Sequence, residues 1–381
     1  MSSKLHTELV LVGGGHSHAI ALKLWSQNPL LKVNLTLISD VKNTPYSGML
    51  PGHVAGFYTY QETHINLSHL AKVAGAKLII DKAVDLDLNS NQVMLQRHQP
   101  MSFDYLSLDI GSTPKTSTVP GADQYAIAAK PVPLFLNAWY QLLKTVQNNP
   151  KLPFKIIIIG GGAGGVELAL NMFSRLQKLR PATFSDSIEI ALIHRGKQLL
   201  SGHNSQVSQL LHRLLIKKGI KLYLNTEVTE IKPDRVITSD QQAINTDYTF
   251  WVTQADSPQW IKNSGLATDN QGFILVNHYL QSMSHSQVFA TGDIATIKDD
   301  YRPKAGVFAV RQGKPLYQNW QKMITNQSLK PYTPQKKYLS LIGTGDQRAI
   351  ASWGNFCWHS FLLWYLKDYI DRKFMNQFFD S

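Results

Sequence analysis

Apolar runs that end in glycine clusters organise the chain. Leu9–Val12 is a continuous apolar run that leads into the glycines at 13–15, and an apolar-periodic stretch follows at Ala19–Trp25. This order predicts a buried strand, a glycine turn and a helix. A second apolar run at Val33–Ile38 ends beside Asp40. The N-terminal segment is therefore predicted to form a βαβ unit with an acidic residue at the tip of its second strand.

The same pattern returns in the middle of the chain. Ile156–Ile159 leads into the run GGGAGG at 160–165, an apolar helical pattern begins at Val166, and another strand pattern covers Ile188–Ile193. Two such units predict an α/β fold with two Rossmann-like dinucleotide-binding domains. Supporting strands are expected at Lys77–Ile80 and Lys221–Leu224. A turn-rich crossover is expected at Gly111–Pro120, and a linker is expected at Ser328–Lys337.

The second glycine cluster fits the dinucleotide fingerprint completely. Gly160, Gly162 and Gly165 stand in the pattern GxGxxG between a strand and a helix. The first glycine of this pattern makes a tight turn, the second lets backbone N–H groups approach a pyrophosphate, and the third allows close helix–strand packing. This context favours nucleotide binding over a purely structural turn.

The first cluster departs from the fingerprint at its third position. Gly13 and Gly15 are present, but His18 stands where the third glycine is expected. One of His16 and His18 is predicted to donate a hydrogen bond to a phosphate, and the alternative is that both are loop histidines facing solvent. Asp40 suits a ribose hydroxyl acceptor, with a solvated loop carboxylate as the alternative.

The residues after the second strand of the second unit bear on the choice of nucleotide. The strand ends Ile193, His194, Arg195, without an acidic side chain at its tip. A carboxylate there accepts from the ribose 2′-hydroxyl of NADH, whereas an arginine pairs with the 2′-phosphate of NADPH. Arg195 therefore favours NADPH, unless it is an ordinary surface charge.

Composition narrows the chemistry and the partners. The 381 residues contain one cysteine, Cys357, which excludes a disulfide framework and a zinc site built on several thiolates. The histidines are scattered without HExxH spacing, so no metal is assigned. The formal charge of +12 favours anionic partners, but no nucleic-acid-binding motif accompanies it, and phosphorylated cofactors are a sufficient explanation.

The two ends of the chain bear on its location. No stretch approaches the ~20 apolar residues of a membrane span, and the N-terminus lacks a secretory pattern, so a cytoplasmic protein is expected. Asn355–Phe379 combines many aromatic residues with Lys367, Arg372 and Lys373. An amphipathic helix of this kind suits attachment to the cytoplasmic face of a membrane. The alternative is a helix packed on the core or on a second subunit of a homodimer.

Several longer segments resemble one family of flavoproteins. They are VLVGGGHSHA, TPYSGMLPGHVAGFYT, LDIGSTP, IIIIGGGAGGVELAL, VFATGDIA, RPKAGVFAVRQGKPL and IGTGDQRAIASWG, which run from Val10 to Gly354. The chain resembles the pyridine nucleotide-disulfide oxidoreductase superfamily. It is similar to type II NAD(P)H:quinone oxidoreductases and to the FAD-dependent module found fused to selenophosphate synthetase.

The resemblance implies a role for each glycine motif and for residues of later segments that reach the cofactor site. The first motif would bind FAD and the second the nicotinamide nucleotide. Gly292 and Asp293 of ATGDIA would close over the flavin, with Asp293 at its ribityl and phosphate region. Gly111 and Phe308 lie in matching segments and are assigned to the cofactor site. Glu167, which follows the second motif, would help to seat the nicotinamide, with helix-end stabilisation as the alternative.

The expected redox chemistry excludes thiols and leaves the acceptor open. The segment Pro45–Gly56 matches the place where relatives carry a redox cysteine pair or a flavin-facing apolar helix. Pro51 of this segment is assigned to the active site. The segment contains no cysteine. Disulfide and persulfide chemistry are therefore rejected. Type II quinone reductases carry an AQxAxQ-like helix beside the flavin, and both of its glutamines are absent from residues 306–311. The N-terminus of this helix and the nearby Lys304 could still stabilise reduced flavin.

The expected organisation places residues 1–120 and 276–330 in the FAD domain, 121–275 in an inserted NAD(P)H domain and 331–381 in a C-terminal cap. Hydride would pass from NAD(P)H to FAD and then to a quinone-type acceptor. The alternatives are a soluble reductase whose acceptor is linked to selenium metabolism, and a non-catalytic flavoprotein that senses redox state.

Overall fold

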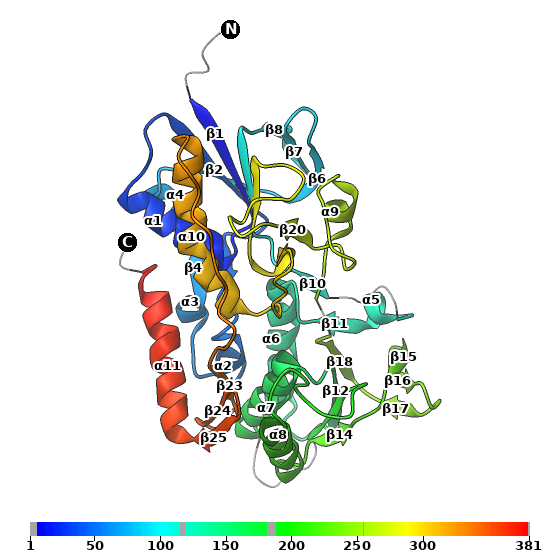
Figure 1. The fold of residues 1–381 in the computed structure, drawn as a ribbon. Coiled ribbons are helices and arrows are strands. Elements are labelled where there is room, and N and C mark those ends of the chain that lie inside the picture. The colour runs from blue at the N-terminus through cyan, green and yellow to red at the C-terminus, as the bar shows by residue number, and fades with distance from the viewer. Residues whose placement is uncertain (1–5, 115–118, 181–187, 254, 380–381) are drawn as a thin grey trace.

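A first parallel sheet forms the N-terminal half of the molecule. The computed structural model describes residues 6–114, 119–180, 188–253 and 255–379. The order across this sheet is β21-β9-β1-β2-β5, and its pairings are parallel. Its strands are β1 (Thr7–Val12), β2 (Val33–Ser39), β5 (Lys77–Ile80), β9 (Tyr105–Leu108) and β21 (Val288–Ala290). The strands predicted at 9–12, 33–38 and 77–80 are thus confirmed, and β21 returns from far along the chain (Figure 1).

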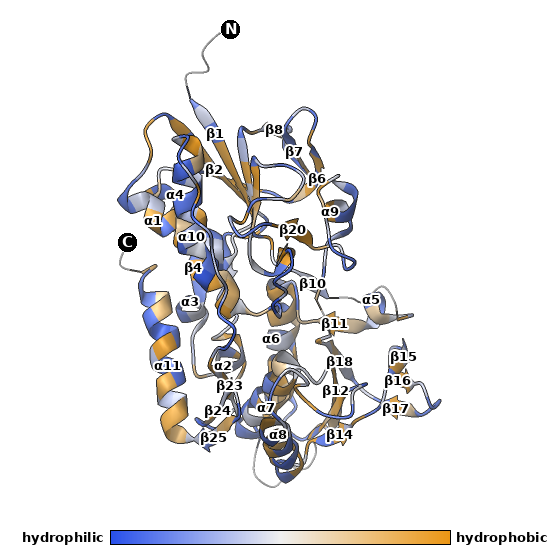
Figure 2. Cartoon of the chain, in the orientation of Figure 1, coloured by the Kyte–Doolittle hydropathy of each residue, from blue (hydrophilic) through white to orange (hydrophobic). Residues whose placement is uncertain are grey.

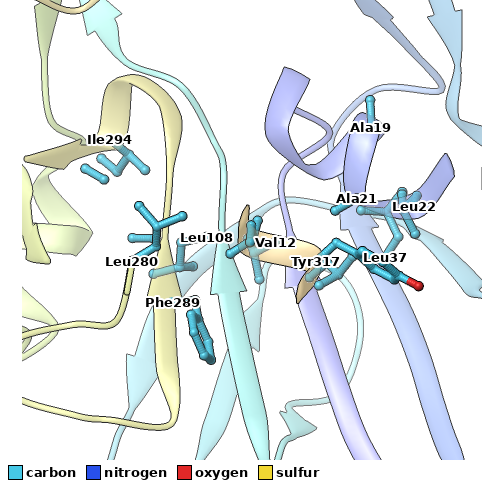
Figure 3. Close-up of a cluster of buried hydrophobic side chains, with 14 of the residues drawn as sticks. Val12, Ala19, Ala21, Leu22, Leu37, Leu108, Leu280, Phe289, Ile294 and Tyr317 are labelled. Carbon is cyan, nitrogen blue, oxygen red and sulfur yellow. The ribbon is translucent and has the colours of Figure 1, made fainter. Parts of the chain in front are cut away.

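The strands of this sheet are apolar on both faces, as expected for a parallel sheet covered on both sides. In Figure 3, Val12, Leu108 and Phe289 come from the neighbouring strands β1, β9 and β21, and Leu22 and Leu37 lie on the other side of the cluster. All five side chains are buried. The sheet therefore holds the carboxyl ends of β1 and β9 rigidly beside each other.

Two long helices cover one part of the first sheet. α1 (His16–Gln27) begins directly after the first glycine turn and packs against α10 (Gly306–Ile324). A Cβ at Gly313 of α10 would lie 2.6 Å from Cβ of Ile20, so the missing side chain lets these helices touch. Shorter helices follow on this domain: α2 (Leu50–Val54), α3 (Tyr60–Thr63), α4 (Leu67–Val73) and α9 (Gln259–Asn263).

A second parallel sheet is inserted between the two parts of the first. Its order is β11-β18-β12-β13-β14, with strands β11 (Ala126–Ala128), β12 (Phe154–Ile159), β13 (Ile188–Ile193), β14 (Lys221–Tyr223) and β18 (Tyr248–Trp251). Its helices are α5 (Ala122–Tyr125), α6 (Val132–Asn148), α7 (Ala163–Lys178) and α8 (Ser205–Lys217). The expected α/β fold with two Rossmann-like domains, one inserted in the other, is confirmed. The precise boundaries at 120, 275 and 330 stay predictions.

Small sheets and turns complete both domains. β6 (Ala83–Asp87), β7 (Gln92–Leu95) and β8 (Met101–Ser102) form one antiparallel sheet, and β15 (Val228–Ile231), β16 (Arg235–Thr238) and β17 (Ala243–Asn245) form another. Three two-stranded sheets remain: β3 (Asn43–Pro45) with β4 (His64–Asn66), β10 (Thr113–Pro114) with β19 (Ala255–Asp256), and β20 (Ile274–Val276) with β22 (Ala295–Ile297). The 3-10 turn η2 (Gly292–Ile294) lies just before β22.

The C-terminal cap is more than the single helix that the sequence predicts. Its antiparallel sheet consists of β23 (Ser340–Gly343), β24 (Ala349–Trp353) and β25 (Phe356–Ser360), and α11 (Phe361–Asn376) follows directly. The helix predicted for Asn355–Phe379 is therefore too long at its start, because residues 356–360 pair with β24. The linker expected at 328–337 contains neither helix nor strand.

Candidate functional site

The first glycine turn wraps closely around Asp109. Gly13 has φ +95°, and a Cβ there would lie 2.3 Å from the Asp109 carbonyl oxygen. A Cβ at Gly15, the N-cap of α1, would lie 2.3 Å from the Asp109 carboxylate. Gly292 makes the same approach from the returning segment, 2.4 Å from Asp109 Oδ1. The carboxyl ends of β1, β9 and β21 thus converge on one carboxylate.

Asp109 was missed by the sequence reasoning, although it ends the apolar run LSLD. It is 2% exposed and accepts a hydrogen bond of 3.1 Å from the backbone N–H of His18 in the first turn of α1. Burial raises the pKa of Asp109 to about 7. A carboxyl group that changes charge near neutral pH therefore lies beside the turn that is expected to bind a pyrophosphate.

The two histidines of the first motif have different surroundings, and neither is a loop residue facing solvent. His18 is fully buried, with its ring nitrogens 2.7 Å from the Gly13 carbonyl and 2.8 Å from Ser107 Oγ. Both ring nitrogens of His18 are thus used inside the protein, so the predicted hydrogen bond to a phosphate falls to His16, and it stays a prediction. His16 packs edge-on against Tyr46, and its buried Nε2 has no partner. Burial lowers the pKa of both rings to about 4, so both are neutral.

A cation that the sequence did not point to pairs with the acid of the returning segment. Asp293 Oδ2 is 2.9 Å from Lys130 Nζ and accepts a 3.2 Å hydrogen bond from Ser112 Oγ. Burial opposes the charge of Asp293, but Lys130, the Ser112 hydrogen bond and Lys304 together outweigh it and hold the pKa of this carboxyl below its usual value. Lys130 follows β11, so a side chain of the inserted domain reaches the acid of ATGDIA.

Lys304 and Phe308 line a small cavity of about 30 Å³ beside Asp293. Lys304 Nζ donates to the Ala295 carbonyl at 2.7 Å and to Thr296 Oγ1 at 2.9 Å. Burial lowers the pKa of Lys304 to about 8. The ammonium is thus held on β22 rather than left free, and Phe308 packs edge-on against Tyr338. Their expected roles toward a flavin stay predictions.

Gly111, Asp40 and Pro51 are the other residues that the sequence assigns to the flavin or its active site. Gly111 has φ +71° and open space at its Cβ position. Asp40 follows β2 directly and is exposed. Pro51 is buried in α2, which packs against α7 of the inserted domain. The structure brings the first two to the carboxyl edge of the first sheet, and it tests the role of none of the three.

The second glycine turn has the geometry that its pattern predicts. Gly160 has φ +125°, and a Cβ there would lie 2.2 Å from the Val252 carbonyl oxygen. A Cβ at Gly165 would lie 1.9 Å from the Gly160 carbonyl oxygen, so this glycine permits the close packing of helix and turn. Gly162, the N-cap of α7, is exposed and has nothing within 4 Å of its Cβ position. The open side of the turn therefore lies at Gly162.

This turn borders a cavity of about 360 Å³. Its lining includes Arg195 at the end of β13 and residues 251–253 at the end of β18. Trp251 Nε1 and Thr253 Oγ1 are buried without a hydrogen-bond partner. A cavity of this size with two unsatisfied polar atoms and an open helix N-terminus fits a nucleotide.

Glu227 lies in the same cavity. The sequence reasoning considered only the tip of β13, where no acid stands, and so missed a carboxylate supplied by the loop after β14. Nothing in the pattern around Glu227 singles it out, because the residue is brought there by the pairing of strands.

Glu167 does not occupy the expected place. It lies beyond the first turn of α7, whereas the alternative role in helix-end stabilisation needs a place in that turn. Its Oε1 accepts a 2.8 Å hydrogen bond from the Gly343 N–H of the cap. Burial raises its pKa to about 7, although Lys367 opposes this shift. The carboxyl group thus joins the inserted domain to the cap, and its contact with a nicotinamide stays a prediction.

The two glycine turns at the carboxyl edges of the two parallel sheets agree with the outcome of a comparison with known families. The model of the pyridine nucleotide-disulphide oxidoreductase family matches residues 7–313. The chain belongs to this family. The resemblance drawn from the motifs is thereby confirmed, and the protein is an oxidoreductase of a family that uses a flavin and a nicotinamide nucleotide.

Two named proteins and one solved structure are similar over more than half of the chain. A NADH dehydrogenase-like protein of Bacillus subtilis, YutJ, is 24% identical and covers 90% of this chain and 91% of its own length. The demethylphylloquinone reductase NdbB of Synechocystis is 27% identical over 56% of this chain and 52% of its own. The structure of NDH2 from Plasmodium falciparum in complex with NADH superposes with a TM-score of 0.84 at 15% identity, over 98% of this chain and 96% of that one. The last comparison concerns the fold alone.

Proposed function

We propose that the protein is an FAD-dependent NAD(P)H oxidoreductase that passes reducing equivalents to a quinone-type acceptor. The observation that carries this proposal is the pair of glycine turns, one closed around Asp109 and one open on the 360 Å³ cavity. Relatives named as a NADH dehydrogenase-like protein and as a demethylphylloquinone reductase support the donor and the acceptor.

The first turn suits FAD. Gly13, Gly15 and Gly292 leave no room for a Cβ, and the buried Nε2 of His16 lacks a partner that a bound group could supply. Asp293 would accept from hydroxyl groups of the ribityl chain, and Asp40 from the ribose. Hydride transfer between a nicotinamide and an acceptor is the chemistry that the flavin supplies when bound.

The second cavity suits the nicotinamide nucleotide. The open N-terminus of α7 at Gly162 offers backbone N–H groups to a pyrophosphate. Trp251 Nε1 would donate a hydrogen bond to the nucleotide, and Thr253 Oγ1 would donate or accept one. The protein contributes orientation and exclusion of water, which bring the reacting groups into line.

The experiment that tests this function is an anaerobic titration of the purified yellow protein with NADH and, separately, with NADPH. We expect loss of the oxidised flavin absorbance with at least one nucleotide and its recovery when a quinone is added. Bleaching without recovery would reject the quinone and keep the reductase. Protein without flavin would reject the whole assignment.

We also propose that the cap attaches to a membrane surface, where a lipid-soluble quinone is found. Phe361, Leu362, Tyr365, Leu366 and Tyr369 are exposed and share one face of α11 by their helical spacing. Trp353, Phe356 and Trp358 extend this apolar tail face onto β24 and β25. Figure 2 shows hydrophobic residues concentrated in the first half of α11. In the described residues, no helix is both long and apolar enough to span a bilayer.

Vesicle sedimentation tests the attachment. Because Leu363 and Met375 on the opposite face of α11 are core residues, substitution is preferable to deletion of the tail. We expect the triple variant Phe361→Ser, Leu362→Ser, Leu366→Ser to lose binding to anionic vesicles, while Leu134→Ser, an exposed apolar residue on α6, keeps it. Unchanged vesicle binding together with a loss of dimers in solution would instead identify the tail face as a subunit interface.

A further inference from the structure

We propose that Glu227 and Arg195 act as opposing determinants of nucleotide choice at the adenosine 2′-position, so that the site accepts both NADH and NADPH. This inference rests on the proposed function, because it takes the cavity beside Gly160 to be the nicotinamide nucleotide site. It revises the preference for NADPH that Arg195 alone suggests.

Backbone hydrogen bonds hold Glu227 beside the residues that follow β13. The Thr226 N–H donates to the His194 carbonyl at 3.1 Å, and the Asn225 N–H donates to the Gly196 carbonyl at 3.1 Å. The loop after β14 is therefore fastened on both sides of Arg195. The carboxylate that the strand tip lacks is supplied from this neighbouring loop.

Both charged side chains are free to act on a ligand. Arg195 and Glu227 are exposed residues that line the cavity. Within the part of the chain that the structure describes, neither side chain forms an ion pair or a hydrogen bond, whereas Glu230 nearby pairs with Lys232. No internal partner therefore has to be displaced when a nucleotide binds.

The third polar side chain at this edge does not contribute charge. His194 Nδ1 accepts a 3.2 Å hydrogen bond from the Gly161 N–H, which fixes the ring against the glycine turn. Burial lowers the pKa of His194, so the ring is neutral at pH 7. Among the described lining residues, Arg195 and Glu227 are then the charged ones.

These two charges act in opposite directions on a 2′-phosphate. The guanidinium attracts the dianion and can pair with two of its oxygens. The carboxylate repels the phosphate but accepts a hydrogen bond from a 2′-hydroxyl. Loss of the carboxylate should therefore favour NADPH, and loss of the guanidinium should favour NADH.

Binding of NAD⁺ and NADP⁺ to the flavin-loaded protein, measured by isothermal titration calorimetry, tests the inference without turnover. The readout is the ratio of the Kd of NADP⁺ to that of NAD⁺. We expect Glu227→Gln to lower this ratio by about fivefold or more and Arg195→Gln to raise it by a similar factor, as charge-assisted hydrogen bonds require. The matched control Glu230→Gln, a carboxylate outside the cavity, should leave it unchanged.

The possible failures are distinguishable. If both nucleotides bind the wild-type protein but Glu227→Gln leaves the ratio unchanged or raises it, this inference is overturned and the proposed function stands. If the wild-type protein binds neither nucleotide, the proposed function fails with it. Because the two charges are exposed, their opposing effects should both shrink as the salt concentration rises.

Discussion

Asp109 illustrates how one side chain connects the two parts of the first domain. Its carboxylate lies against the missing side chains of Gly15 and Gly292, which come from the two ends of that domain. It also caps the first turn of α1 through the His18 N–H. The cost of its burial should therefore appear in the dependence of stability on pH.

The expected sign follows from the raised pKa. The folded protein keeps the Asp109 proton up to about pH 7, whereas the unfolded chain releases it near pH 4. The folded state thus binds more protons between these values, and this group lowers the free energy of unfolding as pH rises from about 4 to 7. In urea unfolding, the free energy of unfolding of Asp109→Asn relative to wild type should increase as the pH is raised from 5 to 8, by an amount on the order of 1–3 kcal/mol.

The control is Asp123→Asn, which removes an exposed carboxylate from α5. The difference in the free energy of unfolding between this control variant and wild type should not change with pH. Taking differences between variants also removes the contribution of His16 and His18, whose lowered pKa values make stability rise with pH over about 4 to 6.5. An Asp109→Asn curve parallel to the wild-type curve would contradict the prediction.

Gly162 and Gly165 should respond differently to the same substitution. Gly165→Ala places a Cβ 1.9 Å from a backbone oxygen, and we expect a loss of about 2 kcal/mol or more in the free energy of unfolding. Gly162→Ala has open space and an extended backbone that alanine adopts, so stability should stay within about 0.5 kcal/mol. The Cβ added by Gly162→Ala would instead lie on the side of the turn where the nucleotide is proposed to bind, and it should weaken the affinity for NAD⁺. Equal stability of the two variants would argue against this division of roles.

At the scale of elements, α11 has one face in the core and one face exposed. On its inner face Lys367 donates to the Gly48 carbonyl and pairs with Asp371, and both side chains are less than 10% exposed. Near its end Arg372 pairs with Glu62 of α3 at 2.7 Å, in a more exposed position. Lys367 belongs to the buried face, so the expectation that it serves a basic membrane-binding face is wrong.

The buried and the more exposed ion pairs of α11 should differ in their importance for stability. Lys367→Met leaves Asp371 buried without its cation, and we expect a loss of about 3 kcal/mol in urea unfolding. Arg372→Gln should cost less than about 1 kcal/mol, because exposed pairs contribute little. The double variant Lys367→Met, Asp371→Leu should regain most of the loss. A similar small cost for both single variants would show that the buried pair does not stabilise the helix.

At the scale of the whole molecule, the cap contacts both dinucleotide-binding domains (Figure 1). On the inserted domain, Asp346 pairs with Lys218 at 3.2 Å and Ser352 Oγ lies 2.8 Å from His203 Nδ1. On the first domain, Asp371 accepts a 3.2 Å hydrogen bond from Tyr46. The cap therefore couples the two domains, and they are expected to unfold together.

Calorimetry of the flavin-loaded protein checks this coupling. We expect one thermal transition, coincident by far-ultraviolet circular dichroism and by flavin release. NAD⁺ at about 100 times its Kd should stabilise the folded state by about 2.7 kcal/mol and move the whole transition. Two transitions, of which only one responds to the nucleotide, would mean that the domains unfold independently.

The sequence by itself determined the strands and turns whose causes are local. The short apolar runs that end at Gly13 and Gly160 predict buried strands, and each glycine turn needs backbone conformations or close approaches that a Cβ prevents. Local pattern therefore sufficed for the two-domain α/β fold and the family. It misjudged the start of α11, because residues 356–360 are ordered by pairing with a neighbouring strand rather than by their own periodicity.

Only the tertiary structure decided which side chains meet. His18 and Glu167 stand at motif positions, yet the fold directs them to Ser107 and Gly343. Asp109 and Glu227 were not singled out by any motif, yet strand packing brings one to the first glycine turn and the other to the second cavity. Spacing along the chain predicts an element, whereas the surroundings of a charged group depend on segments far away in sequence, and those surroundings determine its protonation and its partners.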